Sequence, residues 1–291
     1  MHPDLRGAVI PPPIRRFTLP LIRAGIRVQA LIPTQGVEVL TISAGPGIRL
    51  HQPPPGDVPA PALLWIHGGG YLFGHARQDD ALCAGFAREL GITVAAVDYR
   101  LAPEHAYPDA LDDCYAALQW LVGLPTVDPS RVAIGGASAG GGLAATLAMR
   151  ARDAGEITPV LQLLTYPMLD DRTSARPDPR RRSYGWDVRA NRFGWDSYLG
   201  DAPRDVAVPA RRTDLRGLPP AWIGVGDLDL FYSEDLAYAE RLKAAGVKCD
   251  IEVVPGVFHG FDSIVPKAAV SRAFFEAQCA ALRQAVTAQT T

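Results

Sequence analysis

The sequence predicts an α/β protein with a mostly parallel sheet of eight strands and helices on both faces. Strand-like and helix-like runs alternate from residue 62 to the end of the chain, which is typical of parallel strands joined by helices. The run Ala62-Leu63-Leu64-Trp65-Ile66 is continuously apolar, as expected of a strand buried on both faces. The pentapeptide Gly136-Ala137-Ser138-Ala139-Gly140 lies between a strand-like run and a helix-like run.

Composition limits the class of protein further. The chain has 291 residues, of which 48% are hydrophobic and 21% charged, and its formal net charge is −2. No block of Lys and Arg indicates nucleic acid or an anionic membrane as the main partner. No apolar run reaches the roughly 18 residues of a membrane span, and Met1 to Arg16 does not resemble a secretory signal. We expect a cytoplasmic protein.

The four cysteines are far apart and share no spacing typical of a metal site. Free thiols in a reducing cytoplasm are therefore expected rather than disulfides. We expect no metal and no cofactor.

Each element is predicted from its own pattern. Strands are expected at 37–42, 48–50, 62–66, 92–97, 131–134, 160–165, 221–225 and 249–254, and helices at 78–90, 109–122, 143–154, 233–245 and 267–286. Gly45-Pro46-Gly47 between the first two strands is a hairpin signal.

Two segments break the alternation. Residues 1–35 begin proline-rich and then become mildly amphipathic, which predicts short helices lying over the main domain. Residues 170–218 are too long and too polar for a simple crossover and contain several aromatic residues, so we expect a lid with a helix near 191–199. The predicted organisation is an N-terminal cap segment at 1–35, a core at 36–169 and 219–291, and a cap insertion at 170–218.

The pattern Gly-x-Ser-x-Gly between a strand and a helix describes a nucleophile elbow. The chain turns so sharply there that the residues two positions from Ser138 must be small. The N–H of Ala139 stands at a helix N-terminus, where backbone donors favour negative charge. A glycine-rich turn with a non-catalytic serine would have the same sequence pattern, so the two interpretations can be distinguished only by residues elsewhere in the chain.

A serine nucleophile needs a base that is oriented by a third group. Only His259 follows the elbow among the six histidines, directly after the strand at 249–254. Asp227 and Asp229 both follow the strand at 221–225, and either carboxylate could serve. His67-Gly68-Gly69-Gly70-Tyr71 follows the strand at 62–66 and can present backbone N–H groups to an oxyanion.

The sequence resembles the hormone-sensitive-lipase-like carboxylesterases of the α/β-hydrolase fold, also known as bacterial esterase family IV. The resemblance covers nearly the whole chain and is carried by His67-Gly68-Gly69-Gly70, Asp98-Tyr99-Arg100-Leu101-Ala102-Pro103-Glu104, Gly136-Ala137-Ser138-Ala139-Gly140-Gly141, Tyr166-Pro167-Met168-Leu169 and His259-Gly260-Phe261.

The resemblance implies roles for individual residues. Ser138 would be the nucleophile, His259 the general base and Asp229 the orienting acid, because the family's acid precedes an apolar residue and a helix start. The oxyanion donors would be the N–H groups of Gly69, Gly70 and Ala139. His67 would hold the glycine loop in place, and Glu104 would brace it. A cap would form from residues 1–35 and 170–218, and we expect Tyr71, Trp186 and Trp195 at the substrate pocket.

Two positions depart from the family's pattern. Many members have Asp before the nucleophile and Pro after the catalytic acid, whereas this chain has Ala137 and Leu230. Neither change removes a reacting group. The run Arg180-Arg181-Arg182 is expected to be a solvated loop.

The predicted function is a serine carboxylesterase that hydrolyses short- to medium-chain acyl esters through an acyl-enzyme intermediate. An amidase, lactonase or acyltransferase would use the same residues. A non-catalytic small-molecule receptor is the alternative from another class, since plant gibberellin receptors resemble this family but lack its catalytic histidine. The expected partner is a small-molecule ester. A homodimer, the natural ester and its stereochemistry are left open.

Overall fold

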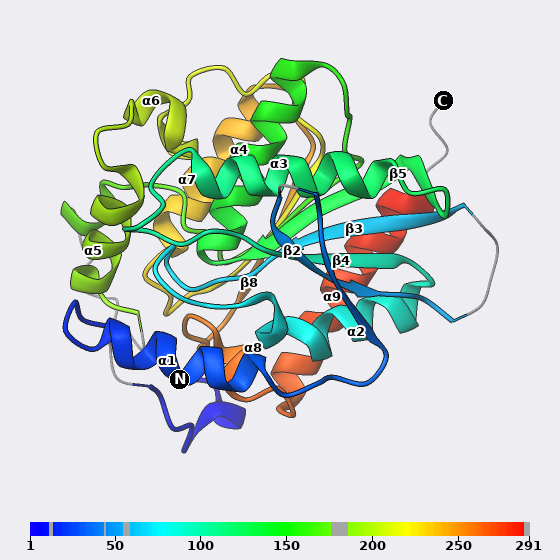
Figure 1. Ribbon diagram of the computed structural model, residues 1–291. Helices are drawn as coiled ribbons and strands as arrows, with labels where there is room; N and C mark the ends of the chain where they lie inside the picture. The colour runs from blue at the N-terminus through cyan, green and yellow to red at the C-terminus, as the bar shows by residue number, and fades with distance from the viewer. Residues whose placement is uncertain (12–13, 44, 55–58, 176–185, 288–291) are drawn as a thin grey trace.

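A computed structural model describes residues 1–11, 14–43, 45–54, 59–175 and 186–287 of the chain. Its centre is an eight-stranded sheet in the order β1-β2-β4-β3-β5-β6-β7-β8 (Figure 1). The strands are β1 Val37–Thr41, β2 Gly47–His51, β3 Ala60–Ile66, β4 Thr93–Asp98, β5 Val127–Ala137, β6 Gln162–Thr165, β7 Ala221–Gly226 and β8 Cys249–Val254. β2 runs antiparallel to β1 and β4, and all other neighbours are parallel. The predicted α/β class with a mostly parallel sheet is confirmed.

The helices are α1 Leu19–Ala30, α2 Asp80–Leu90, α3 Asp109–Val122, α4 Ala139–Ala154, α5 Val188–Leu199, α6 Arg204–Ala207, α7 Tyr232–Ala244, α8 Phe261–Ile264 and α9 Ala269–Thr287. Short 3-10 turns lie at Pro3–Leu5, Ala76–Asp79, Thr173–Ala175 and Pro209–Arg211. The short helices α6 and α8 were not expected, because four residues are too few to show a periodic pattern.

One helix boundary differs in a way that matters for the site. The sequence predicts a helix from residue 143, whereas α4 begins at Ala139. Glycines at positions 140 to 142 have low helix propensity, which hides the start of the helix. Close packing of this turn on the sheet requires a residue without a Cβ at position 140, since a Cβ built on Gly140 would lie only 2.0 Å from the carbonyl oxygen of Ile66.

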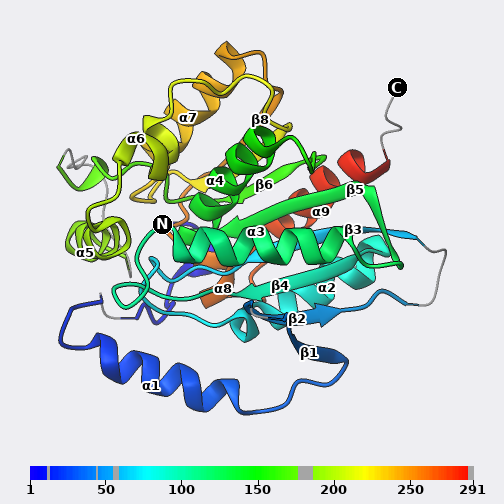
Figure 2. The same cartoon turned by 45° about the horizontal axis from the view of Figure 1, so that its top comes forward.

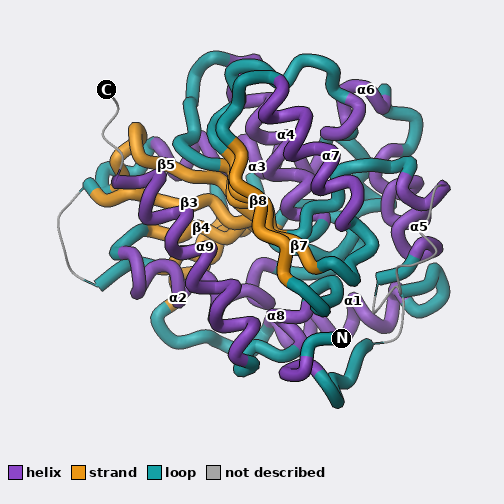
Figure 3. Tube along the Cα trace, turned by 180° about the vertical axis from the view of Figure 1, so that it is seen from behind, coloured by secondary structure: helices purple, strands orange, loops and turns teal. Residues whose placement is uncertain are grey.

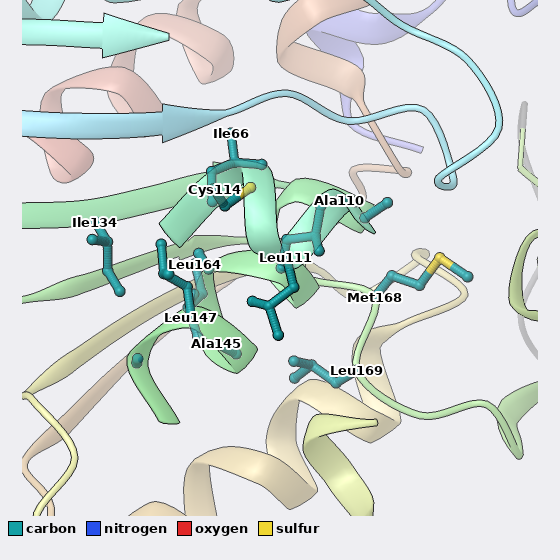
Figure 4. Close-up of a cluster of buried hydrophobic side chains, with 14 of the residues drawn as sticks. Ile66, Ala110, Leu111, Cys114, Ile134, Ala145, Leu147, Leu164, Met168 and Leu169 are labelled. Atoms are coloured by element: carbon teal, nitrogen blue, oxygen red, sulfur yellow. The ribbon is translucent and has the colours of Figure 1, made fainter. Parts of the chain in front are cut away.

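Helices cover both faces of the sheet, and alternate residues of β3 point to opposite sides. Leu64 and Ile66 belong to the apolar cluster formed with α3, α4 and α7, whereas Leu63 and Trp65 belong to the cluster formed with α2 and α9. Figure 4 shows part of the first cluster, and α9 and α2 cross in front of the sheet in Figure 3. This two-sided burial explains why β3 is apolar throughout.

All four cysteines are buried and free of disulfides. In the parts of the chain that the structure describes, no helix is both long and apolar enough to span a bilayer. The loops after β3, β5, β7 and β8 carry the residues that the sequence singles out, and parallel strands place such loops at one edge of the sheet.

Candidate active site

Ser138 occupies the turn between β5 and α4 in a strained conformation. Its φ is 57° and its ψ is −121°, a region that residues other than glycine rarely adopt. A Cβ built on Gly136 would lie 2.5 Å from the carbonyl oxygen of Gly140. The turn therefore closes only with glycine at these positions, and Ser138 itself is largely buried.

A chain of hydrogen bonds joins Ser138, His259 and Asp229. The Oγ of Ser138 lies 2.9 Å from Nε2 of His259, and Nδ1 of the same ring lies 2.8 Å from Oδ2 of Asp229. Oδ1 of Asp229 accepts the backbone N–H of Phe231 at 2.9 Å, so both carboxylate oxygens have partners. In the tautomer with its proton on Nδ1, the imidazole can accept a proton from the serine hydroxyl.

Asp227 and Asp229, which the residue pattern leaves as alternatives and of which the family resemblance implies Asp229, have different contacts in the structure. Oδ1 of Asp227 accepts the backbone N–H of Gly256 at 2.6 Å, and the N–H of Asp227 donates to the carbonyl oxygen of Val254 at 3.2 Å. Asp227 thus ties its loop to the end of β8. Asp229, which is 1% exposed, is the carboxylate that contacts His259.

The glycine loop after β3 lies against the elbow. A Cβ built on Gly68 would be 3.3 Å from Cβ of Ser138, and one built on Gly70 would be 1.9 Å from the indole of Trp186. Gly70 has a φ of 58° and Gly69 a φ of 128°. Among the residues that the structure describes, none accepts a hydrogen bond from the N–H of Gly69, Gly70 or Ala139. These donors remain available to a ligand.

His67 holds this loop and takes no part in the hydrogen-bond chain to Ser138. Its Nδ1 lies 2.7 Å from the carbonyl oxygen of Gly68, and its own carbonyl accepts the hydroxyl of Tyr99 at 3.0 Å. The two rings stack with centroids 4.3 Å apart. Burial lowers the pKa of His67, so the ring is neutral at neutral pH.

Glu104 acts on the same loop through an arginine of α1. Its carboxylate accepts Nη1 of Arg23 at 2.8 Å, while Nε of Arg23 donates to the carbonyl oxygen of Leu72 at 2.7 Å. His75 and His105, in loops near these motifs, lie beside carboxylates: Nε2 of His75 lies 3.2 Å from Asp98, and Nδ1 of His105 lies 2.9 Å from Asp109.

The three expected pocket aromatics lie near the glycine loop but in different surroundings. Trp186 covers Gly70 and is 6% exposed. Tyr71 and Trp195 are buried with Tyr198, with ring centroids 4.0 Å apart for the two tyrosines and 5.3 Å for Tyr71 and Trp195. The Arg180-Arg181-Arg182 run lies outside the described residues.

The sequence did not predict two aromatic residues that flank His259. The rings of Tyr166 and Phe231 meet the imidazole edge-on, with centroids at 4.8 and 5.0 Å. The Tyr166 hydroxyl donates to Asp262 at 2.8 Å, and burial raises the pKa of Asp262. Tyr166 belongs to the Tyr166-Pro167-Met168-Leu169 stretch that carries the family resemblance, so the sequence did mark its position. Nothing in the sequence marks Phe231.

Buried carboxyl groups on α7 lie behind the site. Glu234 accepts the backbone N–H groups of Leu169 and Asp170 at 2.6 and 3.1 Å, and burial raises its pKa to about 8. Burial and the nearby Glu234 and Asp229 raise the pKa of Asp235 as well. In the described parts of the chain, no group of three or more His, Cys, Asp or Glu residues is placed to hold a metal ion.

The sequence matches a protein family and several characterised relatives. The sequence profile of a family described as having the alpha/beta hydrolase fold matches residues 63–263. Esterase LipI of Mycobacterium tuberculosis is 38% identical over 232 residues, which are 75% of this chain and 72% of the relative. Ethyl acetate hydrolase of Pseudomonas putida is 36% identical over 232 residues, which are 74% and 70% of the two chains.

Solved structures agree over almost the whole chain. The bacterial heroin esterase superposes with a TM-score of 0.89 at 35% identity and covers 99% of this chain and 98% of its own. Esterase LipW from Mycobacterium marinum gives a TM-score of 0.88 at 35% identity, with 99% and 96% covered.

Proposed function

Because the chain belongs to the hormone-sensitive-lipase-like carboxylesterases of the α/β-hydrolase fold, which are carboxylic ester hydrolases, we propose that it hydrolyses short- to medium-chain esters through Ser138, His259 and Asp229. The observation that carries this proposal is the hydrogen-bond chain of 2.9 and 2.8 Å that links the three side chains.

In the acylation step, His259 Nε2 takes the proton of Ser138 while Oγ attacks the ester carbonyl carbon. The buried carboxylate of Asp229 keeps the ring in the required tautomer and stabilises the imidazolium that forms. The tetrahedral intermediate collapses when the imidazolium gives its proton to the leaving alcohol. In the second step, water attacks the acyl-enzyme, with His259 again as the base, and releases the carboxylic acid.

The oxyanion is bound by the N–H groups of Gly69, Gly70 and Ala139. Two observations support this assignment: a Cβ built on Gly68 would lie 3.3 Å from Cβ of Ser138, and no described residue accepts a hydrogen bond from these three N–H groups. One such donor is typically worth about 10²–10³ in rate. His67, Tyr99 and the Arg23–Glu104 pair hold the donors in place before substrate binds.

We propose that residues 1–35 and 170–218 form one cap over this site. The Arg15 guanidinium pairs with the Asp187 carboxylate at 2.5 Å, which links the two segments, and Trp186 lies on the glycine loop. Bulky aromatic rings beside the oxyanion donors limit the depth of the pocket, so activity should peak at short acyl chains. The relative named ethyl acetate hydrolase is consistent with a short acyl group.

The test is turnover of p-nitrophenyl esters of increasing acyl length, together with labelling by a serine-directed phosphonate. We expect hydrolysis that falls for long acyl chains, a phosphonate adduct on Ser138, and activity close to background in Ser138→Ala. An adduct on another serine, or undiminished turnover in Ser138→Ala, would refute the assignment. A matched amide and a lactone in the same screen separate ester hydrolysis from the related acyl-transfer reactions.

A further inference from the structure

Helix α1 turns an apolar face toward solvent. Leu21 is 77% exposed and Val28 is 66% exposed, and Phe17 before the helix and Leu31 after it are 80% and 81% exposed. Ala24 and Gly25 lie between them and are also exposed. Positions 21, 24, 25 and 28 share one side of a helix. Figure 2 shows α1 along the edge of the molecule.

The opposite side of α1 fixes this orientation. Leu19 is buried and Ile22 packs on the core, while Arg23 donates to the carbonyl oxygens of Leu72 and Ala102 beneath the helix. The helix therefore cannot bury Leu21 and Val28 by rolling without breaking these contacts. Ile32, which lies beyond the helix, is exposed as well. With Ile32, five large apolar side chains of this one segment face water, which is more than the single exposed apolar residues normal at a protein surface.

The segment that carries this face is rich in arginine. Residues 1–35 contain five arginines and one acidic residue, Asp4, whereas the rest of the chain carries more Asp and Glu than Lys and Arg. Arg15 and Arg23 pair with carboxylates of the protein. Arg16 and Arg27 are exposed beside the apolar face. The arginines are spread along the segment, so they form no block that would stand out in the sequence.

We propose that the outer face of α1 is a peripheral docking surface for an anionic lipid layer. An apolar helix face flanked by arginines suits the boundary between lipid headgroups and acyl chains: Leu21 and Val28 enter the boundary, and Arg16 and Arg27 meet the anionic headgroups. A second copy of the chain suits this face less well, because a symmetric contact would bring the arginines of both helices together and α1 contains no acidic residue to pair with them.

The consequence for catalysis rests on the proposed function, whereas docking itself does not. Arg23 joins α1 to the glycine loop, so a docked molecule holds its oxyanion donors close to the lipid layer. Esters that partition into such a layer would reach the enzyme at a raised local concentration.

The experiment is co-sedimentation of the full-length protein with vesicles of phosphatidylglycerol and phosphatidylcholine in equal parts, compared with pure phosphatidylcholine. We expect binding to the anionic vesicles that weakens with added salt, and at least about tenfold weaker binding for the double variant Leu21→Asp/Val28→Asp. Arg16→Gln/Arg27→Gln should weaken binding only to anionic vesicles. Val206→Asp is the matched control, since Val206 is an exposed apolar residue of α6, 43% exposed, away from this face.

Hydrolysis of a water-soluble short ester by the Leu21→Asp/Val28→Asp variant should equal that of the wild type, which shows that the variant is folded. The proposal is overturned if the wild type does not sediment with anionic vesicles or if the double variant binds as well as the wild type. It is also overturned if light scattering finds a dimer that the double variant dissociates while vesicles bind neither protein. Because sedimentation needs no turnover, a protein that binds vesicles but fails to hydrolyse esters would refute only the proposed function.

Discussion

Replacing Asp229 by Asn tests the triad most directly. Oδ1 of Asp229 accepts the N–H of Phe231, and an asparagine can keep that bond through its own Oδ1. The amide nitrogen would then occupy the position of Oδ2, 2.8 Å from Nδ1 of His259. Two donors cannot face each other, so the ring would carry its proton on Nε2, where it could not accept the proton of Ser138. The equivalent change in a well-studied triad lowers kcat by about 10⁴.

The neighbouring aspartate provides the control. In Asp227→Ala the Gly256 N–H loses its acceptor at 2.6 Å, which should cost about 1–3 kcal/mol of unfolding free energy. The contact between His259 and Asp229 remains, so kcat should stay near that of the wild type. Asp229→Asn should show the reverse, with kcat lowered by orders of magnitude and little change in stability.

Steady-state hydrolysis of p-nitrophenyl butyrate gives kcat for both variants, and thermal unfolding followed by circular dichroism gives their stability. Normal turnover in Asp229→Asn together with an inactive but folded Asp227→Ala would show that the orienting acid had been assigned to the wrong residue. A loss of both activity and fold in Asp229→Asn would contradict the claim that its remaining hydrogen bond is kept.

Three further predictions concern the surroundings of the site. Gly70→Ala places a methyl group 1.9 Å from the buried indole of Trp186. This should displace the oxyanion loop and lower kcat by about 10²–10³. The control is Gly91→Ala: Gly91 has a φ of 65°, similar to the 58° of Gly70, but no atom within 4 Å of a built Cβ, so the change should cost only about 1–2 kcal/mol of stability and leave kcat unchanged. The pKa of Glu234 is raised from 4.5 to about 8, so the folded state binds its proton more tightly; the stability it contributes is present at acid pH and is lost as pH rises toward 8. Unfolding curves should therefore show the wild type losing stability relative to Glu234→Gln as the pH rises from about 4.5 to about 8. Parallel pH profiles of the unfolding free energy for the two proteins would contradict this. Tyr166→Phe removes the donor to the buried Asp262 and should lower the unfolding free energy by about 1–3 kcal/mol, measurable by urea denaturation; unchanged stability would show that the carboxyl finds another partner.

The sequence was sufficient for features that depend on local patterns. The alternation of apolar strands and amphipathic helices predicted a mostly parallel sheet, because burial on both faces imposes a continuous apolar run such as that of β3. The elbow around Ser138 was readable because its five residues carry the Gly-x-Ser-x-Gly pattern, and the close contact of Gly136 with Gly140 lies within that stretch. His259 could be singled out because it is the one histidine after the elbow, and it follows a strand.

Only the tertiary structure could separate Asp227 from Asp229 by contact. The two residues are two positions apart and equally acidic, so the choice depends on how the loop after β7 meets the loop after β8. Tyr166 and Phe231 meet the imidazole from different elements for the same reason. The outward face of α1 was hidden as well. An apolar pattern indicates that a helix has a side to bury, but which of two apolar sides is covered depends on contacts such as Arg23 with Leu72, which join residues 49 positions apart in the chain.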